Sequence, residues 1–166
     1  ECWEALLQSS RFHQLQPRSR AILKKVLNGS SGIATRHLAL ENLGQAFDLT
    51  PDVLHARFTR NAPLLATQAA ERALADAGNQ PDEIDALVIS TCTGYLCPGL
   101  TSYVAERLGC RPDVLAFDLV GQGCVAALPN LAASQALLAA GRCQRVLSIC
   151  VEVCSAVLYF DDDPGV

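Results

Sequence analysis

Three apolar segments of the β-strand type, separated by segments with helical spacing, restrict the possible folds of this chain most strongly. They are DALVIST at 85–91, VLAFDL at 114–119 and RVLSICVEV at 145–153. Their apolar residues run together with little alternation, which is typical of strands covered on both faces. Strands that alternate with helices predict βαβ units, so we expect an α/β fold with a mainly parallel sheet.

Helical spacing and end signals predict the helices between these strands. Residues 62–77 repeat apolar side chains at helical intervals, and Thr50, Pro51 and Asp52 form a typical helix start. Glycines follow the helices expected at 17–28, 62–77, 100–108 and 125–140. The last of these is apolar on every side, which predicts a helix buried between layers.

The composition favours a domain with a real core and a surface meant for a partner. Half of the 166 residues are hydrophobic and 18% are charged, which is apolar for a soluble domain. The net charge of −4 and the lack of a basic cluster argue against nucleic acid, and Lys24 and Lys25 are interpreted as a solvated helix face. The chain contains no run of about 18 apolar residues, so no membrane span is predicted. Its N-terminal residues lack the pattern of a secretory signal.

Eight cysteines are present, at positions 2, 92, 97, 110, 124, 143, 150 and 154. Most lie in apolar segments, which is typical of reduced, buried thiols rather than of a disulfide framework. No Cys-x-x-Cys pair occurs, and His13, His37 and His55 all precede the cysteine-rich half. We therefore expect no metal, no cofactor and a cytoplasmic protein.

Cys124 stands out because it follows Gly-Gln-Gly between an expected strand and an expected helix. Gly121 and Gly123 would allow a tight turn, and free N–H groups at the helix start favour an anion. A thiolate held there could attack a thioester. The pattern alone leaves a second interpretation open, in which Cys124 is one more small buried residue.

Three segments in register resemble type III polyketide synthases, the chalcone synthase-like family. They are STCTGYLCPGLTSYVAERLG, VGQGCVAALPNL and RVLSICVEVCSA. The resemblance runs from about Ser19 to the end of the chain, and CTGYLCPG and DDDPG are most similar to the bacterial branch with alkylresorcinol and alkylpyrone synthases. It implies a thiolase-like fold, a homodimer, and polyketide formation from an acyl-CoA starter and malonyl-CoA by decarboxylative condensation.

The resemblance also implies roles for particular residues. Cys124 matches the nucleophile that carries the acyl group. Cys97 matches a residue that reaches across the dimer into the partner's cavity, although an ordinary buried loop cysteine is the alternative. Cys154 and Val157 match positions that line the cavity.

Cys92 and Glu152 match two members of a hydrogen-bonded network that can influence cyclisation in plant members of the family. A threonine stands at the Cys92 position there, and a thiol is a weaker donor than a hydroxyl. Glu152 is also unusual on its own, because a carboxylate in an apolar strand must find partners or hold a proton. A solvated strand end is the alternative for Glu152.

Residues 1–166 are expected to be a partial N-terminal thiolase-like domain that lacks the family's first strand and its C-terminal domain. The family's catalytic histidine and asparagine would lie beyond residue 166, so we expect residues 1–166 alone to be inactive. Two other interpretations stay open: a ketoacyl-ACP synthase III-like condensing enzyme, against which CTGYLCPG argues, and a non-catalytic dimerisation module.

Overall fold

The computed structural model describes residues 2–28, 32–33, 35–159 and 162. The chain divides into two compact units, one made of residues 1–57 and 154–166 and the other of residues 58–153. We call the first the helical unit and the second the sheet unit. The sheet unit contains all three strands that the structure describes and the predicted nucleophile.

The sheet has three parallel strands in the order β2-β1-β3. They are β1 (Ala86–Thr91), β2 (Leu115–Val120) and β3 (Val146–Cys150). In the register, Val88 of β1 lies between Phe117 and Ser148. All six residues of β1 are buried, because this strand is central and covered on both faces. The predicted parallel sheet is therefore confirmed.

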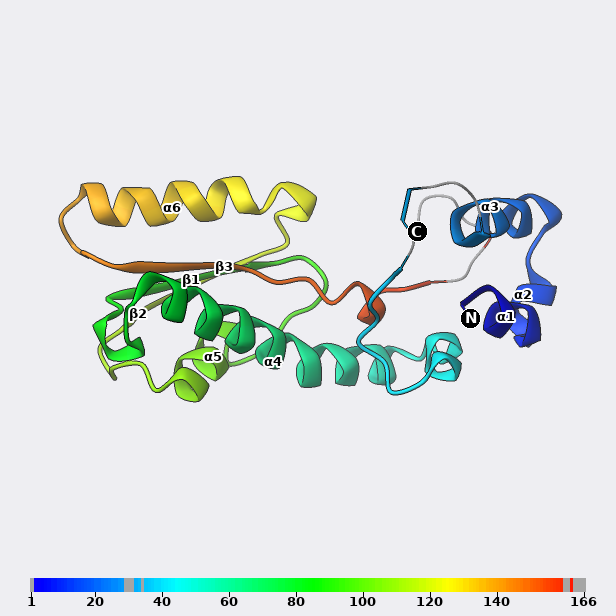
Figure 1. Cartoon of the computed structure of the whole chain (residues 1–166), viewed down its shortest axis with the longest axis horizontal. Helices are drawn as coiled ribbons and strands as arrows, with labels where there is room; N and C mark the ends of the chain where they lie inside the picture. Colours follow the sequence, from blue (N-terminus) through cyan, green and yellow to red (C-terminus); the bar gives the residue numbers. More distant parts are fainter. Residues whose placement is uncertain (1, 29–31, 34, 160–161, 163–166) are drawn as a thin grey trace. The chain divides into compact units, whose positions relative to one another are not determined.

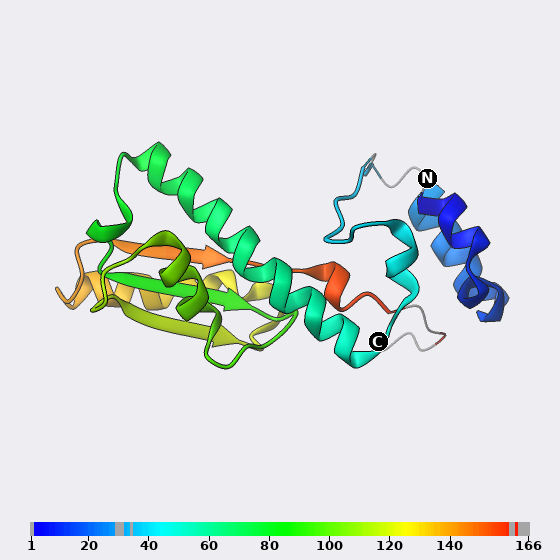
Figure 2. The same cartoon turned by 90° about the horizontal axis from the view of Figure 1, so that it is seen from below.

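Helices cover both faces of the sheet. α6 (Ala127–Ala139) lies on one face, and α5 (Leu100–Leu108) and the C-terminal part of α4 (Pro51–Ala77) lie on the other (Figures 1 and 2). In α4, Ala62, Ala66 and Ala70 are almost fully buried, and their small side chains allow close packing. Within the described residues, no helix is both long and apolar enough to cross a membrane.

The helix boundaries largely follow the predictions. α5 has the expected bounds, and Gly78, Gly109 and Gly141 each adopt the positive φ of a helix C-terminus. The start signal at residues 50–52 and the helix at 62–77 belong to one continuous helix, α4. β3 is shorter than predicted and ends at Cys150. Beyond it, the Glu152 carboxylate and the Val153 N–H bond with residues 92 and 93.

α6 is less buried than its apolar composition predicted. Among the described residues of the sheet unit, α6 is covered on one face only, and Leu128 and Leu131 on its other face are 69% and 58% exposed. Its buried face carries polar residues, since Asn130 is 0% exposed and Ser134 is 7% exposed. The apolar composition of the helix therefore does not arise from burial against this sheet.

The helical unit has its own small core. The unit contains α1 (Cys2–Gln8), α2 (Ser10–Gln14), the predicted α3 (Pro17–Asn28), and the short 3₁₀ helices η1 (Leu43–Phe47) and η4 (Cys154–Ala156). Leu6, Phe12 and Leu15 form the centre, and Trp3 packs edge-on against Phe12 at 5.4 Å between ring centroids. Of the DDDPG segment, only Asp162 is among the described residues, and it accepts a hydrogen bond from the Gln16 N–H at 2.8 Å.

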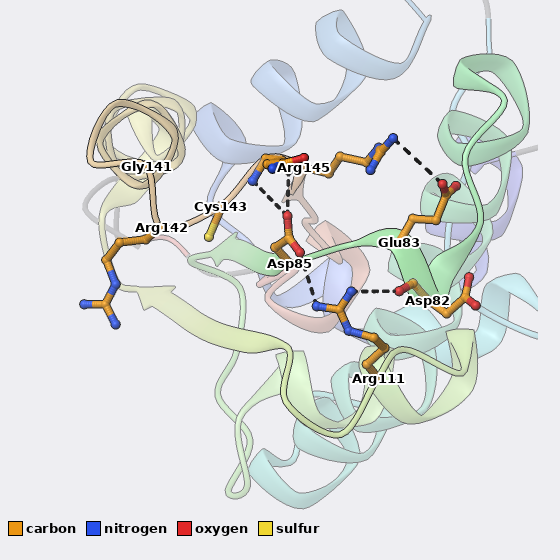
Figure 3. Close-up of a pocket in the computed structure, with 9 residues that line it drawn as sticks. Asp82, Glu83, Asp85, Arg111, Gly141, Arg142, Cys143 and Arg145 are labelled. Atoms are coloured by element: carbon orange, nitrogen blue, oxygen red, sulfur yellow. Dashed lines mark hydrogen bonds and ion pairs between the residues drawn. The ribbon is translucent and has the colours of Figure 1, made fainter.

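An ion network joins the amino ends of the strands around a hollow (Figure 3). Asp85, just before β1, accepts hydrogen bonds from the N–H groups of Gln144 and Arg145 at 2.8 and 3.0 Å, and pairs with Arg111 at 3.2 Å. These two N–H groups, followed by the Arg111 guanidinium, lower the pKa of Asp85 below its ordinary value. The network therefore holds the starts of β1 and β3 together.

Candidate functional site

The carboxyl ends of the three parallel strands meet at one edge of the sheet. Each strand is followed there by one segment: residues 92–99, 121–126 and 151–153. In parallel α/β sheets, ligands bind at this edge. Four of the predicted site residues lie in these segments, namely Cys92, Cys97, Cys124 and Glu152.

Cys124 lies in a tight turn between β2 and α6. Gly121 and Gly123 adopt φ values of 76° and 70°, which other residues rarely reach. The Gly121 N–H donates to the Thr91 carbonyl at 3.1 Å, so the turn is joined to the end of β1. Cys124 is in the 3₁₀ turn Gly123–Val125, and α6 begins at Ala127, two residues later than predicted.

The Cys124 side chain is exposed. The alternative in which Cys124 is a small buried residue therefore does not describe this structure. Its turn directly precedes the first turn of α6, where free N–H groups and the helix dipole favour an anion. An accessible thiol at the carboxyl edge of a parallel sheet can attack an electrophilic carbonyl.

The other cysteines do not fit the prediction of buried thiols. None of the eight, all of which are among the described residues, forms a disulfide, but only Cys143 is buried, whereas Cys2 and Cys110 are partly exposed. Burial raises the pKa of the Cys110 thiol. The prediction was wrong because several of these cysteines lie in segments that follow the strands rather than inside the core.

Glu152 receives hydrogen bonds from three consecutive residues at the end of β1. Its carboxylate accepts from the Cys92 N–H at 2.9 and 3.1 Å, from the Thr93 N–H at 3.0 Å and from the Thr93 hydroxyl at 2.7 Å. The Thr91 hydroxyl adds a longer bond of 3.4 Å. Glu152 is exposed, yet it is not merely solvated, because N–H and O–H donors surround it.

Thr93 closes this arrangement, because its hydroxyl also accepts a hydrogen bond from the Val153 N–H at 2.9 Å. The resemblance pointed to Cys92 and Glu152 as members of one hydrogen-bonded network, and the structure does bring them together. Cys92 contributes its backbone N–H, however, and the hydroxyl groups come from Thr91 and Thr93. Sequence reasoning missed both threonines, although they flank Cys92 directly.

Asn130 fixes α6 on the sheet beneath the Cys124 turn. Its Nδ2 donates to the Ile149 carbonyl at 2.9 Å and lies 3.3 Å from the Val88 carbonyl and 3.2 Å from the Ser90 hydroxyl. Its Oδ1 accepts from the Ser148 hydroxyl at 2.6 Å. This amide therefore bridges β1 and β3 from the helix that follows the turn. The sequence signal was a single polar residue early in an apolar helix.

The remaining predicted residues lie elsewhere or have no tested role. Cys97 is exposed and is joined to Pro98 by a cis peptide bond. Cys154 and Val157 are exposed and belong to the helical unit, so a cavity role for them stays a prediction. His13, His37 and His55 also belong to the helical unit. Within the described part of the chain, no three His, Cys, Asp or Glu side chains are grouped to hold a metal.

Comparison with known proteins supports the resemblance over nearly the whole chain. The family described as FAE1/type III polyketide synthase-like protein matches residues 4–165. The alpha-pyrone synthesis polyketide synthase-like Pks18 of Mycobacterium tuberculosis is 31% identical over 155 residues, which cover 90% of this chain and 39% of Pks18. The beta-ketoacyl-[acyl-carrier-protein] synthase III 3 of Streptomyces coelicolor is 40% identical over 137 residues, covering 82% of this chain and 35% of that protein.

Among solved structures, CsyB complexed with CoA-SH superimposes with a TM-score of 0.76 at 26% identity. The match covers 92% of this chain and 43% of CsyB. The chain thus spans less than half the length of the relatives it matches, consistent with the predicted thiolase-like N-terminal half. With its Gly-x-Gly-Cys turn at the carboxyl edge of a parallel sheet, the chain belongs to the FAE1/type III polyketide synthase-like family.

Proposed function

We propose that the protein is an acyltransferase of the type III polyketide synthase class with Cys124 as its nucleophile. The observation that carries the proposal is the exposed Cys124 thiol in a glycine-flanked turn before α6. Family membership supports the reaction class, since the matched relatives include polyketide synthases. The substrates are an acyl-CoA starter and malonyl-CoA.

The proposed chemistry begins with acyl transfer. The Cys124 thiolate attacks the carbonyl carbon of the acyl-CoA thioester, the CoA thiolate leaves, and the acyl group is now a thioester of Cys124. Malonyl-CoA then loses its carboxylate as carbon dioxide, and the electrons of the broken carbon–carbon bond form an enolate. The enolate carbon attacks the acyl carbonyl on Cys124, and the Cys124 thiolate leaves again.

We further propose that a cavity for the growing chain adjoins the carboxyl edge of the sheet. Cys92, Cys97 and Glu152 would face it there. The family resemblance adds Cys154 and Val157 to the proposed cavity-lining residues. The 92–99 segment would reach a second copy in a homodimer, and exposed apolar side chains such as Tyr95 (61% exposed) support such a contact. We propose a cytoplasmic location for this enzyme.

Residues outside 1–166 are part of the proposal. None of His13, His37 and His55 matches the family's catalytic histidine, so we propose that this histidine and the asparagine come from outside residues 1–166. They would supply the proton acceptor for Cys124 and the donors that stabilise the developing oxyanion.

A ketoacyl-ACP synthase III-like activity is a second candidate, favoured by the 40% identity to the Streptomyces coelicolor relative. The two candidates differ in the extender and in the number of condensations. Incubation of the protein with an acyl-CoA and either malonyl-CoA or malonyl-ACP, followed by mass spectrometry of the products, separates them.

The proposed function predicts that malonyl-CoA serves as extender and that the starter gains more than one two-carbon unit. A single condensation that requires malonyl-ACP would establish the second candidate. A protein that binds acyl-CoA but forms no carbon–carbon bond would support the non-catalytic module.

A further inference from the structure

We infer that Asp118 is a positioning residue that fixes the 92–99 segment, and with it Cys97, beside the strand that leads to Cys124. Asp118 lies on β2, six residues before Cys124. The inference rests on the proposed function only for the catalytic consequence of moving Cys97. The clamp itself is a property of this chain that can be tested without any substrate.

Asp118 binds the first turn of α5 with both carboxylate oxygens. The Thr101 N–H donates to Oδ1 at 3.1 Å, and the Thr101 hydroxyl donates to Oδ2. Thr101 is only 2% exposed, so water competes poorly for these two donors. Within the described residues, the carboxylate has no Lys or Arg partner, and the start of α5 provides the compensating positive potential.

The helix that Asp118 binds lacks a capping side chain of its own. Gly99 is the N-cap residue of α5 and makes no side-chain hydrogen bond. The start of a helix leaves backbone N–H groups without partners. Asp118, which lies on β2, accepts a hydrogen bond from the N–H group of Thr101. The carboxylate therefore replaces the missing N-cap side chain.

Gly99 allows the close approach of the Asp118 carboxylate. A Cβ atom built on Gly99 would overlap the Asp118 carboxylate, although the φ of Gly99 is −60° and any residue could adopt it. The constraint is thus a close approach of the segment to the carboxylate rather than an unusual backbone conformation. Gly99 follows Cys97 by two residues, so the contact restricts the end of the segment next to Cys97.

Glu152 holds the opposite end of the same segment, through the N–H groups of Cys92 and Thr93. Between the two clamps Leu96 is buried, whereas Tyr95 and Cys97 are exposed. The segment is therefore held at one end by Glu152, at the other end by Asp118, and between them by the buried side chain of Leu96. Loss of Asp118 frees the end that carries Cys97 and leaves the end at Glu152 in place.

Amide hydrogen exchange of the protein, followed by mass spectrometry, tests the clamp. In Asp118→Ala we expect the amides of Thr101 and Ser102 to exchange about fivefold faster, the factor that corresponds to losing a typical N-cap. The amides of β1 should keep their rates. Asp118→Asn should stay within about twofold of the wild type, since its amide oxygen can still accept from the Thr101 N–H.

Asp113→Ala is the matched control, because Asp113 pairs with Arg111 at the other edge of the sheet and its loss should leave residues 92–102 unchanged. Thr101→Val removes the hydroxyl alone and keeps the shape of the side chain. It should raise exchange at the start of α5 by about twofold, and it provides a second test if Asp118→Ala fails to fold.

The effect of Asp118 on catalysis is measured from the length of the polyketide products. In Asp118→Ala we expect the number of added two-carbon units to change while the rate of Cys124 acylation stays within about twofold. Unchanged exchange in both Asp118→Ala and Thr101→Val would overturn the clamp, and so would an equal increase throughout the sheet unit. A changed exchange pattern with an unchanged product pattern would overturn the link to Cys97. If the wild-type protein that includes the proposed histidine and asparagine forms no polyketide, the proposed function fails, and the exchange data still decide the clamp.

Discussion

The two edges of the sheet use carboxylates in different ways. At the amino edge, Asp85 accepts two backbone N–H groups and also pairs with the Arg111 guanidinium. At the carboxyl edge, Glu152 and Asp118 accept hydrogen bonds from N–H and O–H groups, and no lysine or arginine occurs in residues 91–99, 120–126 or 150–153. Similar acceptors thus hold strands together at one edge and position the segments around a thiol at the other.

This difference explains why the hollow in Figure 3 is not the candidate site. That hollow is lined by charged residues that mostly satisfy one another, and its cysteine, Cys143, is buried. At the carboxyl edge the exposed thiol lies in a turn of uncharged residues, 121–126, which suits an uncharged acyl chain better. The polarity of the parallel strands therefore separates a structural edge from a reactive one.

The strongest test of this comparison replaces one cysteine at each edge. Cys124→Ala should lower polyketide formation from an acyl-CoA and malonyl-CoA by about 10⁶-fold, as expected when a covalent nucleophile is lost. Cys143→Ala should leave the rate within about twofold. A large loss of activity in Cys143→Ala, with Cys124→Ala active, would reverse the assignment of the two edges.

A second rate prediction concerns residues 1–166 by themselves. They should release no more carbon dioxide from malonyl-CoA than their own Cys124→Ala variant, because each missing oxyanion donor costs about 10²–10³-fold in rate. Release above that control, measured with labelled malonyl-CoA, would show that these residues contain a complete catalytic set.

Asn130 lies between the two edges, so its loss should weaken the sheet unit. Asn130→Leu removes the partners of the Ser148 hydroxyl and the Ile149 carbonyl and leaves buried polar groups unsatisfied. We expect the free energy of unfolding to fall by about 1–3 kcal/mol, measured by urea denaturation. The control Gln135→Leu, on the exposed side of α6, should stay within about 0.5 kcal/mol of wild type, and equal effects of the two changes would contradict the bridging role.

The amino edge should respond to acid through Asp85. Since the pKa of the folded carboxyl lies below its unfolded value of about 3.9, its stabilisation is fully present above that value and is lost as the pH falls through the folded pKa. Asp85→Asn should therefore reduce the dependence of stability on pH below about 4. Asp76→Asn, on the exposed face of α4, is the control, and an unchanged acid profile in Asp85→Asn would argue against the network.

The smallest effect is expected at the outer face of α6. Leu128 is 69% exposed, so Leu128→Ser should change the free energy of unfolding of residues 1–166 by less than about 0.5 kcal/mol. A loss of about 2 kcal/mol or more would show that this face is covered, for example by a second copy of the chain.

The sequence predicted the parts of this fold that depend on local patterns. Continuous apolar segments located the strands, and glycine signals located the ends of α5 and α6. Burial of α6 could not be judged from its composition, because its apolar face turns away from this sheet and Asn130 turns toward it.

Contacts between residues that lie far apart in the chain could not be predicted from the sequence either. Thr93 meets Glu152 across 59 residues and Thr101 meets Asp118 across 17, and no local pattern reports such pairs. The resemblance identified Cys92 and Glu152 as neighbours but not the donors that join them. Cys124 was the one site residue whose local sequence, a turn with two glycines, already indicated its geometry.

Direct detection of the acyl group tests the central claim, that Cys124 is the nucleophile of the carboxyl edge. The protein is mixed with an acyl-CoA, quenched in acid, digested and mapped by mass spectrometry. The account predicts the mass of the acyl group on the peptide that contains Cys124, and its absence from the peptides of the other seven cysteines. An acyl group carried by Cys92, Cys97 or Cys150 instead, or by no cysteine while products still form, would contradict it.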